Sequence, residues 1–189
     1  MSGIDLSRRA IEHARRRLAL LGLESLLLVA DAECLPFADS AFDLVYSWGV
    51  IHHSPDTAAA VAEIHRVLRP GGTARIMIYH RASLVGYMLW LRYALARARP
   101  WTSLDRVYAN HLESPGTKAY SRAQARALFG AFAEVRIETR LTHADLLESQ
   151  AGQRHEGALI RIARKLWPRP LLRRFAAAHG LFMLVTALK

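Results

Sequence analysis

Residues 1–80 alternate short apolar runs with segments of helical spacing, and this alternation limits the fold more than any other feature of the chain. The apolar runs predict strands at residues 3–6, 26–30, 42–47 and 73–79. After the first strand we expect a helix capped by Ser7 that ends at Gly22. A second helix, opened by Ser54 and Pro55, should precede the last strand. Strands joined by helical crossovers predict an α/β fold with an open, mostly parallel, Rossmann-like sheet.

Residues 81–189 are more helical and continue the same domain. The predicted elements are an apolar helix at 83–98, a helix from Ser121 through Phe132, and strands at 135–141 and 181–188, with a basic, mostly helical insertion at 145–178. We therefore predict one domain over residues 1–189. Its parts are the βαβ units of residues 1–80, a lid or insertion at 81–118, and a C-terminal helix and strand pair with its insertion at 119–189.

The apolar stretch at residues 84–96 is too short to span a bilayer, and it contains Arg92. It is therefore expected to be a core or lid helix. Because Arg97 and Arg99 follow it, an interfacial helix stays open as an alternative, and with it a peripheral membrane contact.

The net charge of +10 is concentrated in the second half of the chain. Residues 1–80 carry 8 Arg and 9 acidic residues, whereas residues 81–189 carry 18 basic and 7 acidic residues, a difference of +11. A basic half suits nucleic acid, an anionic membrane or an acidic substrate, but 23 of the 26 basic residues are Arg, which also fits a simple compositional bias. The single cysteine, Cys34, excludes an internal disulfide and, with the absence of a signal-peptide pattern at the start, predicts a cytoplasmic protein.

The residues that end the predicted strands are the first candidates for function, because an open parallel sheet binds ligands beyond the carboxyl ends of its strands. The four strands end in Asp5, in Asp31 and Ala32, in Ser47 and Trp48, and in Tyr79 and His80. A carboxylate such as Asp5 can accept hydrogen bonds from both hydroxyls of a ribose, and Asp31 can read an adenine amino group. Either aspartate is equally suited to hold a turn or cap a helix.

His52 and His53 are adjacent and raise the question of a metal site. In an extended segment neighbouring side chains point in opposite directions, and no third ligand follows at a suggestive spacing. No metal site is therefore predicted.

Four segments within residues 3–72 together resemble class I S-adenosylmethionine-dependent methyltransferases, in particular the type 11 and quinone-biosynthesis groups. The segments are GIDLS at 3–7, DAECLPF at 31–37, FDLVYSWGVIHH at 42–53 and EIHRVLRPGG at 63–72. Their order makes the match specific, far beyond a lone glycine motif. The resemblance also implies an antiparallel strand pair at the C-terminal end.

The resemblance implies S-adenosyl-L-methionine as cofactor and assigns roles by position. Asp5 would hold the ribose, Leu6 would pack on the adenine, Asp31 and Ala32 would read its edge, and Ser47 and Trp48 would line the methionine end. Four residues are weak candidates for a catalytic base by their location: His52, His53, Tyr79 and His80. Methyl transfer needs mainly alignment of the reactants and exclusion of water. The apolar helix at 84–95 favours a small-molecule or lipid-like acceptor.

The chain departs from the family at its start, where only Met1 and Ser2 precede Gly3. The family carries a first strand and a glycine-rich turn before this point, and that strand is the central one of the sheet. The resemblance therefore implies a shortened domain with weak or absent cofactor binding, and an exposed gap that could pair with a second chain.

Three other functions stay open from the sequence. A non-catalytic methyltransferase-fold binding module or a gene fragment would explain the missing turn. A nucleic-acid methyltransferase would use the basic half, although no nucleic-acid motif or aromatic platform supports it. A nicotinamide-dependent oxidoreductase also carries an acid after its second strand.

Overall fold

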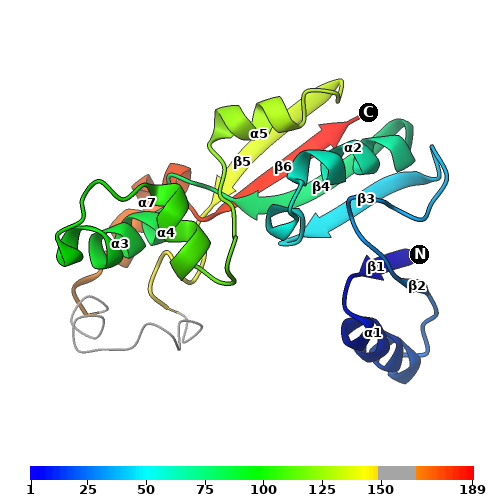
Figure 1. Cartoon of the computed structure of the whole chain (residues 1–189), viewed down its shortest axis with the longest axis horizontal. Coiled ribbons are helices and arrows are strands. Elements are labelled where there is room, and N and C mark those ends of the chain that lie inside the picture. The colour runs from blue at the N-terminus through cyan, green and yellow to red at the C-terminus, as the bar shows by residue number, and fades with distance from the viewer. Residues whose placement is uncertain (149–164) are drawn as a thin grey trace.

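The computed structural model describes residues 1–148 and 165–189, and in this part of the chain the strands form two separate sheets (Figure 1). The strands are β1 (Ser2–Asp5), β2 (Leu26–Val29), β3 (Phe42–Trp48), β4 (Leu68–Tyr79), β5 (Glu134–Arg140) and β6 (Phe182–Leu188). The helices are α1 (Arg8–Leu20), η1 (Ile51–His53), α2 (Thr57–Val67), α3 (Leu84–Tyr93), η2 (Leu95–Arg97), α4 (Leu104–His111), α5 (Arg122–Leu128), α7 (Arg169–Phe175) and η4 (Ala177–His179). The α/β architecture predicted from the sequence is confirmed.

The first sheet is the parallel pair β1–β2, with α1 as its crossover. Ser7 caps α1 as predicted, because its side chain accepts a hydrogen bond from the Ala10 N–H. Ile11 is buried on the inner side of α1, and the helix gives way to a turn in which Gly22 has a φ of +65°. The basic insertion is predicted at residues 145–178, and its residues 149–164 lie outside the described residues.

The second sheet has the order β3-β4-β6-β5. β3 and β4 are parallel, whereas β6 runs antiparallel to both β4 and β5, which confirms the C-terminal antiparallel pair. The main core lies between this sheet and the helices α2 and α5, and its largest fully buried side chains include Phe129, Ile78 and Met183. α5 begins at the predicted cap, Ser121, which forms a capping box with Gln124.

The start of α2 differs from the sequence prediction. The helix begins at Thr57 and is capped by Asp56, whose carboxylate accepts hydrogen bonds from the N–H groups of Ala58 and Ala59. Ser54 is not the cap, because its hydroxyl donates instead to the carboxylate of Glu33, at 2.6 Å. A contact from another segment therefore displaces the start of the helix by two residues.

A second, smaller core lies under the lid, where α3 packs on α4. Gly86 of α3 lies directly against the ring of Tyr108, and the Tyr108 hydroxyl contacts Ser83 and the carbonyl oxygens of His80 and Arg81. One face of the predicted apolar helix, with Val85, Gly86 and Leu89, is therefore buried. No helix among the described residues combines the length and apolar character needed to cross a membrane.

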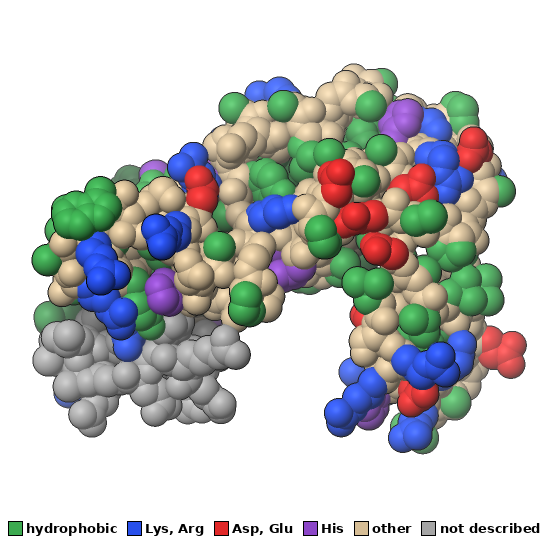
Figure 2. Space-filling model, in the orientation of Figure 1, with side chains coloured by type: hydrophobic (Ala, Val, Ile, Leu, Met, Phe, Trp, Pro, Cys, Tyr) green, Lys and Arg blue, Asp and Glu red, His purple; other side chains and the backbone are tan. Residues whose placement is uncertain are grey.

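β1 and β3 each keep one edge without a partner strand within the described residues, and they belong to different sheets. In Figures 1 and 2 the β1–α1–β2 unit stands apart from the larger sheet, and the molecule is hollowed beside it. Alternate side chains of β3 are left open to solvent as a result: Leu44 is 55% exposed, Tyr46 63% and Trp48 47%. In a doubly covered parallel sheet such side chains would be buried, so this edge of β3 is open in the described part of the chain.

Candidate functional site

Asp5 and Asp31 follow neighbouring strands and lie at the same edge of the first sheet. Asp5 pairs in register with Val29, and the Ala30 N–H donates to the Asp5 carbonyl oxygen at 3.1 Å. Each aspartate uses one carboxylate oxygen for its own turn: Asp5 Oδ1 accepts from the Ser7 N–H at 2.7 Å, and Asp31 Oδ1 from the Glu33 N–H at 2.9 Å. Both side chains are exposed. The sequence left open that each aspartate holds a turn, and both carboxylates do make such a turn contact.

A cavity of about 250 Å³ opens between β1 and β3. Its lining includes Gly3 and Ile4 of β1 and the predicted cofactor residues Ala32, Ser47 and Trp48. Asp5, Leu6 and Asp31 are not part of this lining, and Leu6 is 69% exposed. The cavity thus brings together three of the six predicted cofactor residues.

Ser47 is the polar group that stands out in this cavity. Its hydroxyl oxygen is buried and has no hydrogen-bond partner among the described residues. A buried hydroxyl without a partner is costly, by about 1–3 kcal/mol. The side chain is therefore suited to a polar ligand in the cavity.

The loop of residues 31–41 covers one side of the cavity and is tied to α2 by two charged side chains. Glu63 accepts from the Leu35 N–H at 2.7 Å, and Arg66 donates to the carbonyl oxygens of Leu35 and Phe37. Arg66 also pairs with Glu63 and Asp39, each at 2.7 Å. The hydrogen bond from Arg66 is the main reason why the pKa of Glu63 lies below its ordinary value.

Replacing Arg66 by lysine should loosen this loop, because an ammonium group cannot reproduce the planar fork that reaches two carbonyl oxygens and Glu63 together. We expect the Leu35 amide to exchange with deuterium about tenfold faster, with little change in overall unfolding. Arg69→Lys is the matched control, since within the described residues Arg69 pairs with Asp43 and the Ser40 carbonyl at the surface. Equal exchange in the two variants would contradict the assignment.

The same loop should respond to acid. Because the folded-state pKa of Glu63 is lowered, its stabilising contribution is complete above the unfolded-state pKa and is lost as the pH falls through the folded-state value. The Leu35 amide should therefore lose protection in the acid range before the main core unfolds.

Glu33 has a role that the sequence analysis missed. Its carboxylate accepts from the Ser54 hydroxyl at 2.6 Å and from the Asp56 N–H at 2.8 Å. It therefore joins the loop after β2 to the start of α2. The available sequence signal was the acidic residue inside the DAECLPF segment, which by itself does not name a partner 21 residues away.

A cluster of polar side chains lies where η1 approaches the end of β4. His53 Nε2 lies 3.4 Å from Glu113 Oε2, and the Tyr79 hydroxyl donates to the same carboxylate oxygen at 2.9 Å. The other ring nitrogen of His53, Nδ1, contacts the hydroxyls of Ser114 and Thr117 at 3.2 and 3.3 Å. Burial, followed by the charge of Glu113, raises the pKa of Tyr79, so its hydroxyl stays protonated.

His52 is fully buried beside this group. Its ring centroid is 4.2 Å from the centroids of both His53 and Tyr79, and neither ring nitrogen has a hydrogen-bond partner in the part of the chain described. Burial, with a contribution from His53, lowers the pKa of His52 to about 3. His52 is therefore a neutral imidazole at physiological pH.

The expectation that the two histidines point in opposite directions is wrong. It assumed an extended segment, but residues 51–53 form a 3-10 turn, η1, that brings the two rings together. His80, in contrast, lies apart from this group: its Nδ1 contacts the Gly180 carbonyl at 3.3 Å, and burial lowers its pKa. Of the four candidate bases, the structure thus groups His52, His53 and Tyr79.

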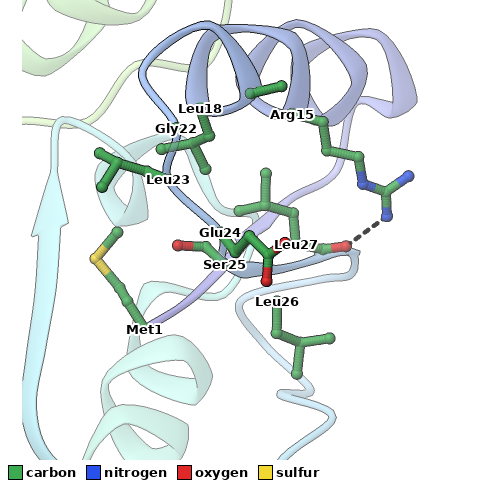
Figure 3. Close-up of a pocket in the computed structure, with 10 residues that line it drawn as sticks. Met1, Arg15, Leu18, Gly22, Leu23, Glu24, Ser25, Leu26 and Leu27 are labelled. Carbon is green, nitrogen blue, oxygen red and sulfur yellow. Dashed lines mark hydrogen bonds between the residues drawn. The ribbon is translucent and has the colours of Figure 1, made fainter.

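A larger hollow of about 740 Å³ lies elsewhere, at the amino ends of β1 and β2 (Figure 3). Arg15 reaches across from α1 to donate to the Leu27 carbonyl oxygen at 2.7 Å, while Met1 and Leu23 lie on the other side. Open α/β sheets bind ligands at the carboxyl ends of their strands. We therefore assign function to the smaller cavity between β1 and β3.

The amino-terminal part of the chain is similar in sequence to known methyltransferases. Residues 1–76 match the protein family described as "Methyltransferase domain". The chain is 39% identical over 72 residues to the ubiquinone/menaquinone biosynthesis C-methyltransferase UbiE of Desulfotalea psychrophila. It is 44% identical over 71 residues to a phthiotriol/phenolphthiotriol dimycocerosates methyltransferase of Mycobacterium ulcerans. Each match covers 38% of this chain, and the chain spans 28% and 26% of those two relatives.

Solved structures match the fold over nearly the whole chain. A methyltransferase from Thermotoga maritima has a TM-score of 0.60 at 20% identity and covers 99% of this chain, which spans 72% of that structure. The [4+2]-cyclase SpnF has a TM-score of 0.59 at 17% identity, with 100% of this chain and 65% of that one covered. Likeness at this identity establishes a shared fold, and a cyclase among these structures shows that the fold hosts more than one reaction. Through residues 1–76 the chain is similar to the methyltransferase-domain family, and over its length it shares the fold of these solved structures.

Proposed function

We propose that this chain supplies the nucleoside-binding and acceptor-binding sides of a methyltransferase that uses S-adenosylmethionine and acts on a small-molecule or lipid-like acceptor. The observation that carries the proposal is the cavity between β1 and β3, into which the predicted cofactor residues Ala32, Ser47 and Trp48 converge. Strands β1, β3 and β4 run in the same general direction in Figure 1, so the polar group around His53 follows the same edge of the fold.

The residues present fit part of the cofactor. The buried, unpartnered hydroxyl of Ser47 suits a polar ligand, and Ala32 also lines the cavity. The volume of about 250 Å³ is smaller than the roughly 300–1,000 Å³ of typical small-molecule pockets. The cavity lining therefore suits one part of the cofactor. Asp5 and Asp31 lie outside the lining, and each keeps a second carboxylate oxygen beyond the one that holds the turn.

When bound, the cofactor supplies an activated methyl group for an in-line transfer. The protein's part is then to position the acceptor and exclude water. An acceptor that carries a proton also needs a base. His52, whose pKa is lowered to about 3, is poorly suited to that role.

The acceptor class is supported by two observations. The relatives include proteins named for quinone biosynthesis and for dimycocerosate lipids, and one named 27-O-demethylrifamycin SV methyltransferase, from Amycolatopsis mediterranei. In this chain the lid helix α3 is mostly apolar, with Tyr87 and Leu91 exposed. An apolar lid favours an acceptor with a hydrocarbon or aromatic body.

The test is transfer of a radiolabelled methyl group from S-adenosylmethionine to a panel of lipid-soluble phenols, quinols, polar amines and RNA. Both residues 1–189 and a form preceded by a relative's first strand and glycine-rich turn should be assayed. We expect label only in the lipid-soluble fraction. Label confined to polar amines or RNA would overturn the acceptor class. No transfer by either form, despite cofactor binding, would favour the non-catalytic binding module.

A further inference from the structure

His52, His53 and Glu113 bring three metal-ligand atoms to one place, although they come from segments 60 residues apart. The ligand atoms lie within 4.8 Å of one another. We propose that these three residues bind a divalent transition-metal ion of the zinc class. The proposal does not rest on methyl transfer, because an ion can bind here whichever reaction the fold carries out.

The spacing between His53 and Glu113 fits a bridging ion better than a direct contact. At 3.4 Å, Nε2 and Oε2 are too far apart for a good charge-assisted hydrogen bond, which is about 2.7–2.9 Å long. Bonds to zinc of about 2.0–2.2 Å in tetrahedral geometry place two ligand atoms roughly 3.4 Å apart. The observed separation therefore leaves room for an ion between the two side chains.

The surrounding hydroxyls orient both ligands. Ser114 and Thr117 contact His53 Nδ1, which leaves Nε2 directed toward the carboxylate. Tyr79 donates to the same oxygen of Glu113. Hydrogen bonds to the far side of a metal-bound imidazole and to a bound carboxylate are the usual outer shell of a zinc site.

His52 supplies the independent observation. Its side chain is fully buried, and neither ring nitrogen has a hydrogen-bond partner among the described residues. A buried polar group normally has a partner, and a neutral imidazole is the form that binds metal. Two imidazoles and one carboxylate suit Zn²⁺, Co²⁺ or Ni²⁺ rather than Mg²⁺ or Ca²⁺, and three protein ligands leave one position open for an oxygen of a bound molecule.

This site and a free His53 base exclude each other, because the ion takes the lone pair that would accept the proton. The sequence alone opposed a metal site for two reasons, the assumed extended segment and the missing third ligand. The turn η1 removes the first, and Glu113, brought in after α4, removes the second.

The experiment is calorimetric titration of the tag-free, chelator-treated chain with ZnCl₂, repeated with Co²⁺ to follow its visible absorption. We expect one strong site per chain, and Glu113→Gln and His53→Gln should each weaken binding by at least about 100-fold. Tyr79→Phe, which removes an outer-shell hydrogen bond, should weaken it by about tenfold. His143→Gln is the control, since that exposed histidine pairs with Glu148 away from the site.

Unchanged zinc affinity in Glu113→Gln and His53→Gln would overturn the proposal, as would binding no tighter than millimolar. Circular dichroism of each variant distinguishes loss of the site from loss of the fold. If zinc does not bind but label is still transferred, the metal site fails and the proposed methyltransferase function stands.

Discussion

A form of the chain that carries a β-strand and a glycine-rich turn before Met1 should bind S-adenosylmethionine at least about 100-fold more tightly than residues 1–189 alone, a difference of about 2.8 kcal/mol. The added strand would lie between the open edges of β1 and β3. Each backbone hydrogen bond it makes contributes about 0.5–1.5 kcal/mol net, and the turn adds N–H groups that approach the cofactor directly. Calorimetric titration of the two forms measures the difference.

A third form separates the strand from the turn. If the glycines of the added turn are replaced by valine, the strand should still complete the sheet and bury Tyr46 and Trp48, but the cofactor should bind as weakly as to residues 1–189. Tryptophan fluorescence would report the burial, and calorimetry the affinity. Micromolar binding by residues 1–189 alone would refute the prediction, because it would show that the turn is unnecessary.

Gly180→Ala should be the most damaging small substitution in the described chain, with a loss of at least about 3 kcal/mol in the free energy of unfolding. A Cβ at this position would overlap the backbone of Arg140 and Leu141 at the end of β5. Backbone atoms cannot turn aside as a flexible side chain can. Because β6 begins two residues later and pairs with both β4 and β5, relief of the clash would disturb both pairings.

Gly22→Ala is the matched control for Gly180→Ala. Gly22 also lies beside a chain reversal, but a Cβ there would meet no atom within 4 Å. Its φ of +65° makes the cost purely conformational, about 1–2 kcal/mol. Urea unfolding of both variants measures the two losses. Equal losses would show that the contact with β5 does not set the cost at Gly180.

The elements that follow from local pattern were predictable from the sequence. The caps at Ser7 and Ser121 and the strands β2 and β3 all depend on residues within one turn or one strand of each other. The start of α2 was not predictable in this way. Glu33 takes the Ser54 hydroxyl, so the cap passes to Asp56, and only the folded chain brings Glu33 to that place.

The candidate site shows the same division. Ala32 comes after β2, and Ser47 and Trp48 end β3, so topology alone places them at one edge, and they do line one cavity. Glu113 could not be assigned from the sequence, because its nearness to His53 depends on how α3 and α4 fold back over the end of β4. The sequence pattern does not predict a role that depends on contact between side chains far apart in the chain.

The place of β6 in its sheet has a consequence for how the protein folds. Tyr79 is paired with Phe182, which is 182 − 79 = 103 residues further along the chain, and β6 is inserted between β4 and β5 rather than added outside them. Closing so long a loop costs entropy before any contact rewards it, and such high contact order slows folding. On the ribosome β4 and β5 must wait, with unpaired inner edges, until residue 188 has emerged, so this interval of synthesis is when the chain is most exposed to aggregation.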